Sequence, residues 1–423
     1  MNVQINSQHS LEASTHGMAA SAASRQVSPR ALARDLRLDF FRGLALIFIF
    51  IDHVPGNSLA NLTMRAFGIS DAAEVFVLIA GFAAFTAYSG PIEREGFRIG
   101  ARRIAGRVRD LYAAHLLLIA VCGTLLALAA QTFENPLYFE DVNLTPLSYD
   151  PWGAIWRLLV LHYQPGYLNI LPLYIVLLAW LPVFIWLLSR GPWTAMAASV
   201  ALWLVAGWLG VNLPSWPDVY GWYFNPLAWQ LLFSIGAFAA FLSVRGGTLP
   251  RSRLLATAAA LYIAVGFLVA APWINIPALE LPRLVAFDFL GYHSKTNLSL
   301  WRLAHVLAVA YLVALLVPAS AVWLRSRVAT WIVNCGRNGL DIFCLGTLLS
   351  FCGFVVMLEA GRTWEFQLAV NVLGIGGMFC TANVLTQRKA GRALAKKAAH
   401  ATARQSSAVR EQAPVEAGAE LPP

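Results

Sequence analysis

Apolar stretches of membrane-spanning length recur from residue 38 to residue 387, and short polar segments separate them. A helix needs about 20 apolar residues to cross a bilayer, and backbone groups inside the bilayer must be satisfied within the chain, which favours helices. The pattern therefore predicts an all-α polytopic membrane protein, a single bundle of about ten transmembrane helices. The predicted spans are approximately 38–58, 71–89, 110–131, 166–188, 193–210, 225–244, 254–271, 300–323, 338–358 and 364–386.

Polar segments flank this region at both ends. Residues 1–35 are rich in Ser and Ala, and residues 388–423 begin basic (QRKAGRALAKK) and end acidic and rich in Pro and Ala. Such compositions bury too little apolar surface to fold alone. We expect two disordered cytoplasmic tails around a transmembrane domain at 36–387, with the basic start of the second tail close to anionic membrane lipid.

The positive charge indicates the orientation of the bundle. If the N-terminus is cytoplasmic, most of the 31 Lys and Arg residues fall in cytoplasmic segments, as the positive-inside rule requires. Both termini are then cytoplasmic, and two long segments rich in aromatic and polar residues, 132–165 and 272–299, lie outside the membrane on the opposite, outer side.

Composition excludes other classes. With 58% apolar and 13% charged residues, the chain is not an ordinary soluble domain. The net charge of +9 does not indicate a nucleic-acid partner, because no basic stretch is interleaved with aromatic residues. The histidines lack the spacing of a metal site, so no metal is expected.

The first span contains ionisable residues that a bilayer disfavours. Asp39, Arg42, Asp52 and His53 lie within or at the ends of this span, and such groups usually face a protein interior or an aqueous cavity and have a function there. Arg42 and His53 are eleven residues apart, so they share a helix face about 16 Å apart along the axis. His53 is a candidate general base; an ordinary histidine at a helix end is the alternative.

The second span begins at the same depth as His53. Its opening sequence, SDAAEVF, places Asp71 and Glu74 where a carboxylate could orient the His53 ring. The same Asp-x-x-Glu spacing also fits a capping box that starts a helix. Both interpretations remain open from sequence.

Two further regions contain candidate binding residues. Six arginines between Arg94 and Arg109 could neutralise a phosphate-bearing ligand, or could serve only to set topology. Polar segments of the outer half combine aromatic rings, amides and charges, which suits sugar hydroxyls, although aromatic belts at the interface look similar. The candidate substrate-binding residues are Asp52, Asp71, His162, Tyr163, Gln164, Asn169, Lys295, Arg302 and His305.

Four segments together resemble a known family. RLDFFRGLALIFIFIDHVPGN, GISDAAEVFVLIAGF, HYQPGYLNILPLYIVLL and KTNLSLWRLAHVLAVAYL are similar to the OpgC family, within the membrane acyltransferase-3 superfamily, over approximately residues 35–387. The family resemblance implies a bacterial inner-membrane protein that adds succinyl groups to osmoregulated periplasmic glucans. The superfamily's Arg-x10-His motif maps onto Arg42 and His53, and its basic motif onto Arg103 and Arg107.

The resemblance implies a division of roles. Acyl-CoA, here succinyl-CoA, would be the cytoplasmic co-substrate, bound through Arg42, Arg103 and Arg107. A periplasmic glucan would be the acceptor, and His53, assisted by Glu74 and Arg42, would catalyse the transfer. A carboxylated acyl group needs a cation, for which Arg42, Arg302 and Lys295 are candidates.

Two alternatives differ in their functional consequences. A transporter or flippase of a polar glycan or lipid would also place charges along the bundle interior, but it would need neither a histidine base nor acyl-CoA. An acyltransferase that acts on another surface polysaccharide would share the same bundle and the same site.

Overall fold

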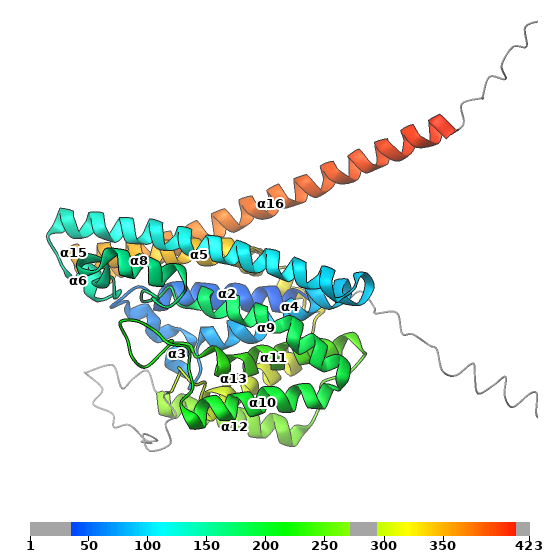
Figure 1. Cartoon of the computed structure of the whole chain (residues 1–423), viewed down its shortest axis with the longest axis horizontal. Helices are drawn as coiled ribbons and strands as arrows, with labels where there is room; N and C mark the ends of the chain where they lie inside the picture. Colours follow the sequence, from blue (N-terminus) through cyan, green and yellow to red (C-terminus); the bar gives the residue numbers. More distant parts are fainter. Residues whose placement is uncertain (1–34, 271–293, 412–423) are drawn as a thin grey trace, which may run out of the picture.

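The computed structural model describes residues 35–270 and 294–411, which fold into one bundle of long helices (Figure 1). No strand occurs among these residues, so the predicted all-α class is confirmed. The elements are α2 (Leu36–Asp52), η1 (Ser58–Leu62), α3 (Met64–Phe67), α4 (Ala72–Glu95), α5 (Phe97–Phe133), α6 (Leu137–Glu140), α7 (Pro146–Tyr149), α8 (Pro151–Leu159), α9 (Ile170–Arg190), α10 (Pro192–Leu209), α11 (Pro226–Val244), α12 (Arg253–Ala270), α13 (Leu300–Leu316), η5 (Val322–Arg325), α14 (Arg327–Arg337), α15 (Gly339–Glu359) and α16 (Trp364–Glu411).

Each of the ten predicted spans contains one long helix. Eight of the described helices are long and apolar enough to cross a membrane: α4, α5, α9, α10, α11, α12, α15 and α16. The other two predicted spans correspond to α2 and α13, which have 17 residues each. The eight apolar helices support a multi-pass membrane protein.

Two parts of the structure differ from the sequence prediction. The arginine-rich stretch before the third span belongs to the helix, because α5 runs without a break from Phe97 to Phe133. Residues 388–411, predicted to be disordered, continue α16, which extends away from the bundle (Figure 1). Arg is the commonest residue of the first stretch, Ala, Arg and Lys dominate the second, and the high helix propensity of these residues accounts for the difference. The predicted tails at 1–34 and 412–423, and residues 272–293 of the predicted outer segment, lie outside the described residues.

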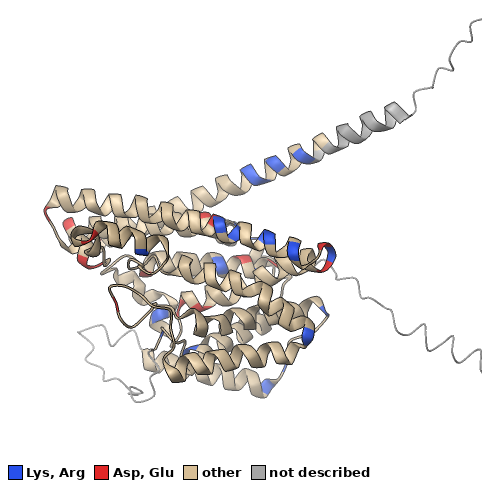
Figure 2. Cartoon of the chain, viewed as in Figure 1, with Lys and Arg blue, Asp and Glu red and all other residues tan. Residues whose placement is uncertain are grey.

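Charge distinguishes the two ends of the bundle. Figure 2 shows Lys and Arg on the first part of α5 and on α16 where that helix leaves the bundle, whereas Asp and Glu gather near α6 at the opposite end. We call the first the basic end and the second the acidic end. Helix α2 begins at the basic end and packs against α4, α14 and α15, so its ionisable residues face protein.

Two glycines allow α2 and α14 to cross at backbone contact. A Cβ atom added at Gly43 would clash with the Ile332 carbonyl oxygen, and one at Gly336 would clash with the Asp39 carbonyl oxygen. Small residues allow close approach of membrane helices, where dispersion and polar contacts provide the stability. The crossing also places the Gly336 carbonyl 3.3 Å from Nη1 of Arg42, which donates to it.

Gly43→Val is expected to destabilise the bundle by about 1–3 kcal/mol, because the added atoms force two backbones apart. The measurement is thermal unfolding of the detergent-solubilised protein. Gly376→Val on α16 is the matched control, since a Cβ atom at Gly376 meets no atom within 4 Å. Equal unfolding midpoints for both variants would contradict the proposed tight crossing.

Amides attach α16 to the rest of the bundle. Asn57 and Asn371 exchange two side-chain hydrogen bonds of 3.1 and 3.0 Å. Closer to the basic end, Nδ2 of Asn334 donates to Oδ1 of Asn383 at 2.7 Å. Paired amides satisfy each other in a low-dielectric interior, and they fix the position of α16 beside α2 and α14.

Candidate functional site

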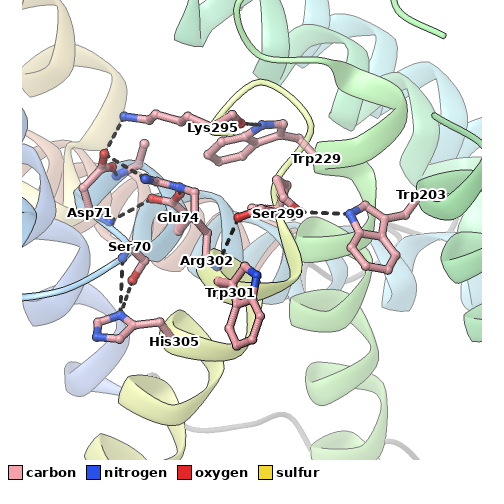
Figure 3. Close-up of polar contacts among 12 residues, drawn as sticks. Ser70, Asp71, Glu74, Trp203, Trp229, Lys295, Ser299, Trp301, Arg302 and His305 are labelled. Atoms are coloured by element: carbon pink, nitrogen blue, oxygen red, sulfur yellow. Dashed lines mark hydrogen bonds and ion pairs between the residues drawn. The ribbon is translucent and has the colours of Figure 1, made fainter. Parts of the chain in front are cut away.

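A carboxylate–cation cluster of Asp71, Glu74, Lys295 and Arg302 lies where α4 begins (Figure 3). Nε of Arg302 donates to Oε1 of Glu74 at 2.6 Å, and its Nη2 donates to Oδ2 of Asp71 at 3.1 Å. Nζ of Lys295 donates to the same Asp71 oxygen. Two anions thus face two cations, and the cluster ties the start of α13 to the start of α4.

The local sequence explains how these carboxylates are positioned. Asp71 is the N-cap of α4 and accepts from the Ala73 N–H at 2.8 Å, while Oε2 of Glu74 accepts from the Asp71 N–H at 3.0 Å. This is the capping box that the Asp-x-x-Glu spacing allowed. The capping bonds leave one oxygen of each carboxylate for the cations.

Burial and charge act in opposite directions on this cluster. Burial alone would raise the pKa of Asp71, but Lys295 and Arg302 hold that pKa well below its usual range. Burial alone would lower the pKa of Lys295, but Asp71 and Glu74 raise it above the ordinary value. The Asp71–Lys295 pair is therefore ionised near neutral pH.

A second polar contact lies beside the cluster, one helical turn further along α13. Nδ1 of His305 is 2.7 Å from Oγ of Ser70 and accepts from the Ser70 N–H at 3.4 Å. The ring is almost fully buried, and a Cβ atom at Gly68 or Gly266 would clash with it or press tightly against it. These contacts fix the loop before α4 to α13, and the substrate-binding role expected for His305 stays a prediction.

His53 ends the α2 helix and packs on an aromatic ring. Its backbone N–H donates to the Ile49 carbonyl at 3.0 Å, and its ring centroid lies 5.0 Å from that of Tyr167. Tyr167 has a left-handed backbone with φ of 65°, which is uncommon for a tyrosine and often marks a functional site. Nδ1 of His53 is buried, and none of the described residues forms a hydrogen bond with it.

Asp52 and His53 lie within electrostatic reach of the cluster. Oδ1 of Asp52 accepts from the Thr63 hydroxyl at 2.7 Å. Asp71, Lys295 and Arg65 carry the charges that act on both Asp52 and His53. The end of α2, the start of α4 and the start of α13 therefore bring their ionisable groups to one region of the bundle.

Toward the basic end, three arginines line one cavity of about 230 Å³. Arg42 comes from α2, Arg107 from α5 and Arg337 from the end of α14. Three guanidinium groups at one cavity can bind phosphate or carboxylate oxygens in planar, bidentate fashion. Nη1 of Arg42 also lies 3.7 Å from Oδ1 of Asp39, so this carboxylate partly offsets the positive charge beside the cavity.

The cavity extends along α4 toward His53. Its wall on α4 runs from Tyr88 near the arginines to Phe76, about 18 Å at 1.5 Å per residue. Alanines at four positions of α4 leave the necessary space: Ala80, Ala83, Ala84 and Ala87. Its far end reaches Ile170, three residues after Tyr167, and Phe76 is two residues from Glu74. The cavity thus runs from the arginines toward the starts of α4 and α9.

Two residues predicted for this site lie elsewhere. Nη2 of Arg103 pairs with Oε2 of Glu95 at 2.6 Å and does not line the cavity, whose nearest lining residue on α5 is Arg107, about one turn further along the helix. Glu74 was predicted to assist His53, but both of its oxygens bond to Arg302 and to the Asp71 N–H. The structure therefore places Glu74 in the cluster and leaves Arg42 and Arg107 at the cavity.

Two side chains of the loop before α9 donate hydrogen bonds to backbone carbonyls. Tyr163 is fully buried and donates its hydroxyl hydrogen to the Asn143 carbonyl, and Nε2 of Gln164 donates to the Leu161 carbonyl at 3.1 Å. No described hydrogen bond joins the side chain of His162 or Asn169 to His53 or to the cluster. The substrate-binding roles expected for these residues from the sequence stay predictions.

Arg302→Met is expected to lower the unfolding free energy by about 3–5 kcal/mol, because it leaves the fully buried Glu74 carboxylate without its cation. Chemical denaturation in detergent measures the loss. Arg109→Met, which breaks an exposed pair with Asp110, should cost no more than about 1 kcal/mol. A similarly small loss for Arg302→Met would show that Glu74 is neutral in the cluster.

The structure adds two site residues that sequence reasoning missed. Arg337 lines the cavity, and the only sequence signal was its place beside Asn338 at the start of a predicted span. Ser70 bonds to His305 from a position 235 residues away in the chain, which no local pattern reveals. Among the described residues, no group of three or more His, Cys, Asp and Glu side chains is placed to hold a metal ion.

Comparison with known proteins gives one match. The family model described as OpgC protein matches residues 34–390, which include His53, the carboxylate–cation cluster and the residues that line the arginine cavity. No curated protein and no solved structure matches the chain.

Proposed function

Because the chain belongs to the OpgC family, a membership that points to acyl transfer, we propose that it is a membrane O-acyltransferase that moves succinyl from acyl-CoA to hydroxyls of a periplasmic glucan. In this proposal it spans the bacterial inner membrane with both termini in the cytoplasm. The basic end then faces the cytoplasm, where acyl-CoA occurs, and His53 lies toward the acceptor.

The cavity is the observation that carries this proposal. It has three arginines at its basic end, an alanine-lined wall along α4, and a far end at Phe76 and Ile170, three residues after Tyr167. Its volume of about 230 Å³ is smaller than the roughly 300–1,000 Å³ of a compact ligand pocket. An elongated group such as the pantetheine arm of CoA suits a narrow channel, with the charged nucleotide phosphates at the arginines.

The reaction at the far end is transfer from a thioester to an alcohol. An acceptor hydroxyl attacks the thioester carbonyl, a C–O bond forms, and the C–S bond breaks. One imidazole nitrogen of His53 takes the hydroxyl proton and passes it to the departing thiolate, which leaves as CoA thiol. No described residue hydrogen bonds with Nδ1 of His53, which supports this role. Transient acylation of His53 remains the alternative route.

The decisive test is transfer across a membrane. The protein is reconstituted in liposomes with succinyl-CoA at the basic end and neutral glucan at the other. Mass spectrometry detects succinyl groups on the glucan, and a thiol assay measures the CoA that is released. We expect succinyl mass additions in proportion to released thiol. Glucan movement without acyl-CoA would favour a transporter, and thiol release only with another polysaccharide would change the acceptor.

Lys295→Met is expected to lower succinyl transfer by ten- to a hundredfold and to leave acetyl transfer nearly unchanged. The Lys295 ammonium has two N–H donors beyond the one that binds Asp71, and a charged hydrogen bond to the free carboxylate is worth about 1.5–3 kcal/mol. Measurement of kcat/KM with succinyl-CoA and with acetyl-CoA tests this. Lys389→Met, at the basic end, is the control. Equal losses for both donors would reject Lys295 as the carboxylate partner.

A further inference from the structure

A second cavity, of about 560 Å³, separates α13 from the core of the bundle. Helices α2, α4, α11 and α13 line it, and it shares no lining residue with the arginine cavity. We infer that this groove binds one acyl chain of a bilayer phospholipid, with an amino-phospholipid headgroup at Asp35 and Arg37. This site is independent of the acyl-transfer proposal.

The groove exists because α13 is attached at its two ends. At the acidic end, Arg302 binds Glu74 and Asp71 of α4. At the basic end, Nη1 of Arg37 donates to the Val317 carbonyl at 2.8 Å, which ties the start of α2 to the end of α13. Between these ties, the face of α13 from Val306 to Ala314 lines the groove.

The lining is amphipathic along its length. Its polar members are Asp35, Arg37, Ser243 and Tyr311, all toward the basic end, and every other lining residue is apolar or glycine. The wall on α2, from Asp35 to Phe48, is about 20 Å long at 1.5 Å per residue. That length exceeds one leaflet, about half of a 30 Å hydrocarbon core. A straight hydrocarbon chain with a polar head matches this distribution.

Neither water nor empty space suits the groove. Protein interiors are close-packed and do not tolerate an unfilled space of this size. Apolar cavities also stay dry, because a water molecule needs two or more polar partners. A membrane protein is surrounded by lipid, so a lipid acyl chain is available to occupy the groove.

The groups at the polar end select the headgroup. Asp35 and Arg37 form a salt bridge with Nη2 to Oδ2 at 2.7 Å, and both side chains are one quarter exposed. One anion beside one cation complements a zwitterion, with the phosphate at the guanidinium and the ammonium at the carboxylate. A phosphatidylethanolamine headgroup has this pair of charges, whereas a purely anionic headgroup would oppose Asp35.

The test uses phosphatidylethanolamine spin-labelled on its acyl chain and added to the full-length protein in mild detergent. Electron paramagnetic resonance counts the motionally restricted lipid per chain. We expect Ala310→Trp, which fills the groove, to retain this lipid about tenfold more weakly than wild type. Arg37→Gln should weaken retention of phosphatidylethanolamine more than that of a labelled phosphatidylglycerol. Leu316→Trp is the matched control, because Leu316 lies on the same helix, is 71% exposed and does not line the groove.

Three results would overturn the inference. The first is restricted lipid in the same amount for wild type and folded Ala310→Trp. The second is that the number of restricted lipids per wild-type chain equals the number bound to the outer surface of the bundle, as estimated from the two tryptophan variants. The third is displacement of the label by palmitoyl-CoA but not by unlabelled phosphatidylethanolamine, which would assign the groove to a donor chain. Thermal unfolding checks folding, and Ala239→Leu on α11 replaces Ala310→Trp if the latter unfolds.

Discussion

His53→Ala is expected to reduce acyl transfer by about 10²–10⁴-fold, the usual contribution of a positioned general base. The KM for acyl-CoA should change little, because Arg42, which is proposed to bind the nucleotide end of the donor, lies about 16 Å away along α2. The loss should therefore appear in kcat. Initial rates of succinyl-glucan formation over a range of acyl-CoA concentrations separate the two parameters.

Two controls distinguish a base from a packing residue. His162→Ala removes another half-buried histidine, whose hydrogen bonds to described residues are made by its backbone, and it should retain the wild-type kcat. Added imidazole should restore part of the activity of His53→Ala, because the small base can occupy the space beside Tyr167. Full activity without His53 would end the general-base proposal, and a loss that imidazole never restores in a folded variant would favour covalent or structural participation.

The sequence predicted the fold well because bilayer constraints are local. Twenty apolar residues must form a helix in hydrocarbon whatever their neighbours are, so each predicted span contains a helix. The helix ends were less predictable. The α5 and α16 extensions outside the apolar core depend on Ala, Arg and Lys propensity, which hydropathy does not measure. The family match confirms the resemblance to the OpgC family that four segments carried.

The contacts at the candidate site could be predicted only within single helices. Arg42 and His53 could be related because they share one helix, whose geometry is fixed. The pairing of Glu74 with Arg302 could not be predicted, because the two residues are 228 positions apart in the chain. Helical periodicity states which side chains share a face, but not which helix that face meets. The place of Arg337 beside Arg42 depends in the same way on the Gly43–Gly336 crossing.

Arg42→Met is expected to raise the KM for succinyl-CoA by about ten- to a hundredfold, the effect of losing one charge-assisted contact of about 1.5–3 kcal/mol. The donor itself can be varied to locate that contact. Succinyl-pantetheine keeps the thioester and the arm but lacks the nucleotide phosphates. If Arg42 binds phosphate, wild type and Arg42→Met should use succinyl-pantetheine equally well. If Arg42 binds the succinyl carboxylate, the variant should lose activity with both donors.

Arg103→Met separates the cavity from the general positive charge of α5. Arg103→Met and Arg42→Met each remove one positive charge near the basic end, so a long-range electrostatic effect would change the KM of both variants. Arg103 pairs with Glu95 and is half exposed, whereas Arg42 lines the cavity and its side chain is only 18% exposed. We therefore expect an unchanged KM for Arg103→Met. Equal increases for both variants, reduced in parallel by added salt, would show that the arginines attract the donor to the membrane surface and that the cavity is not its binding site.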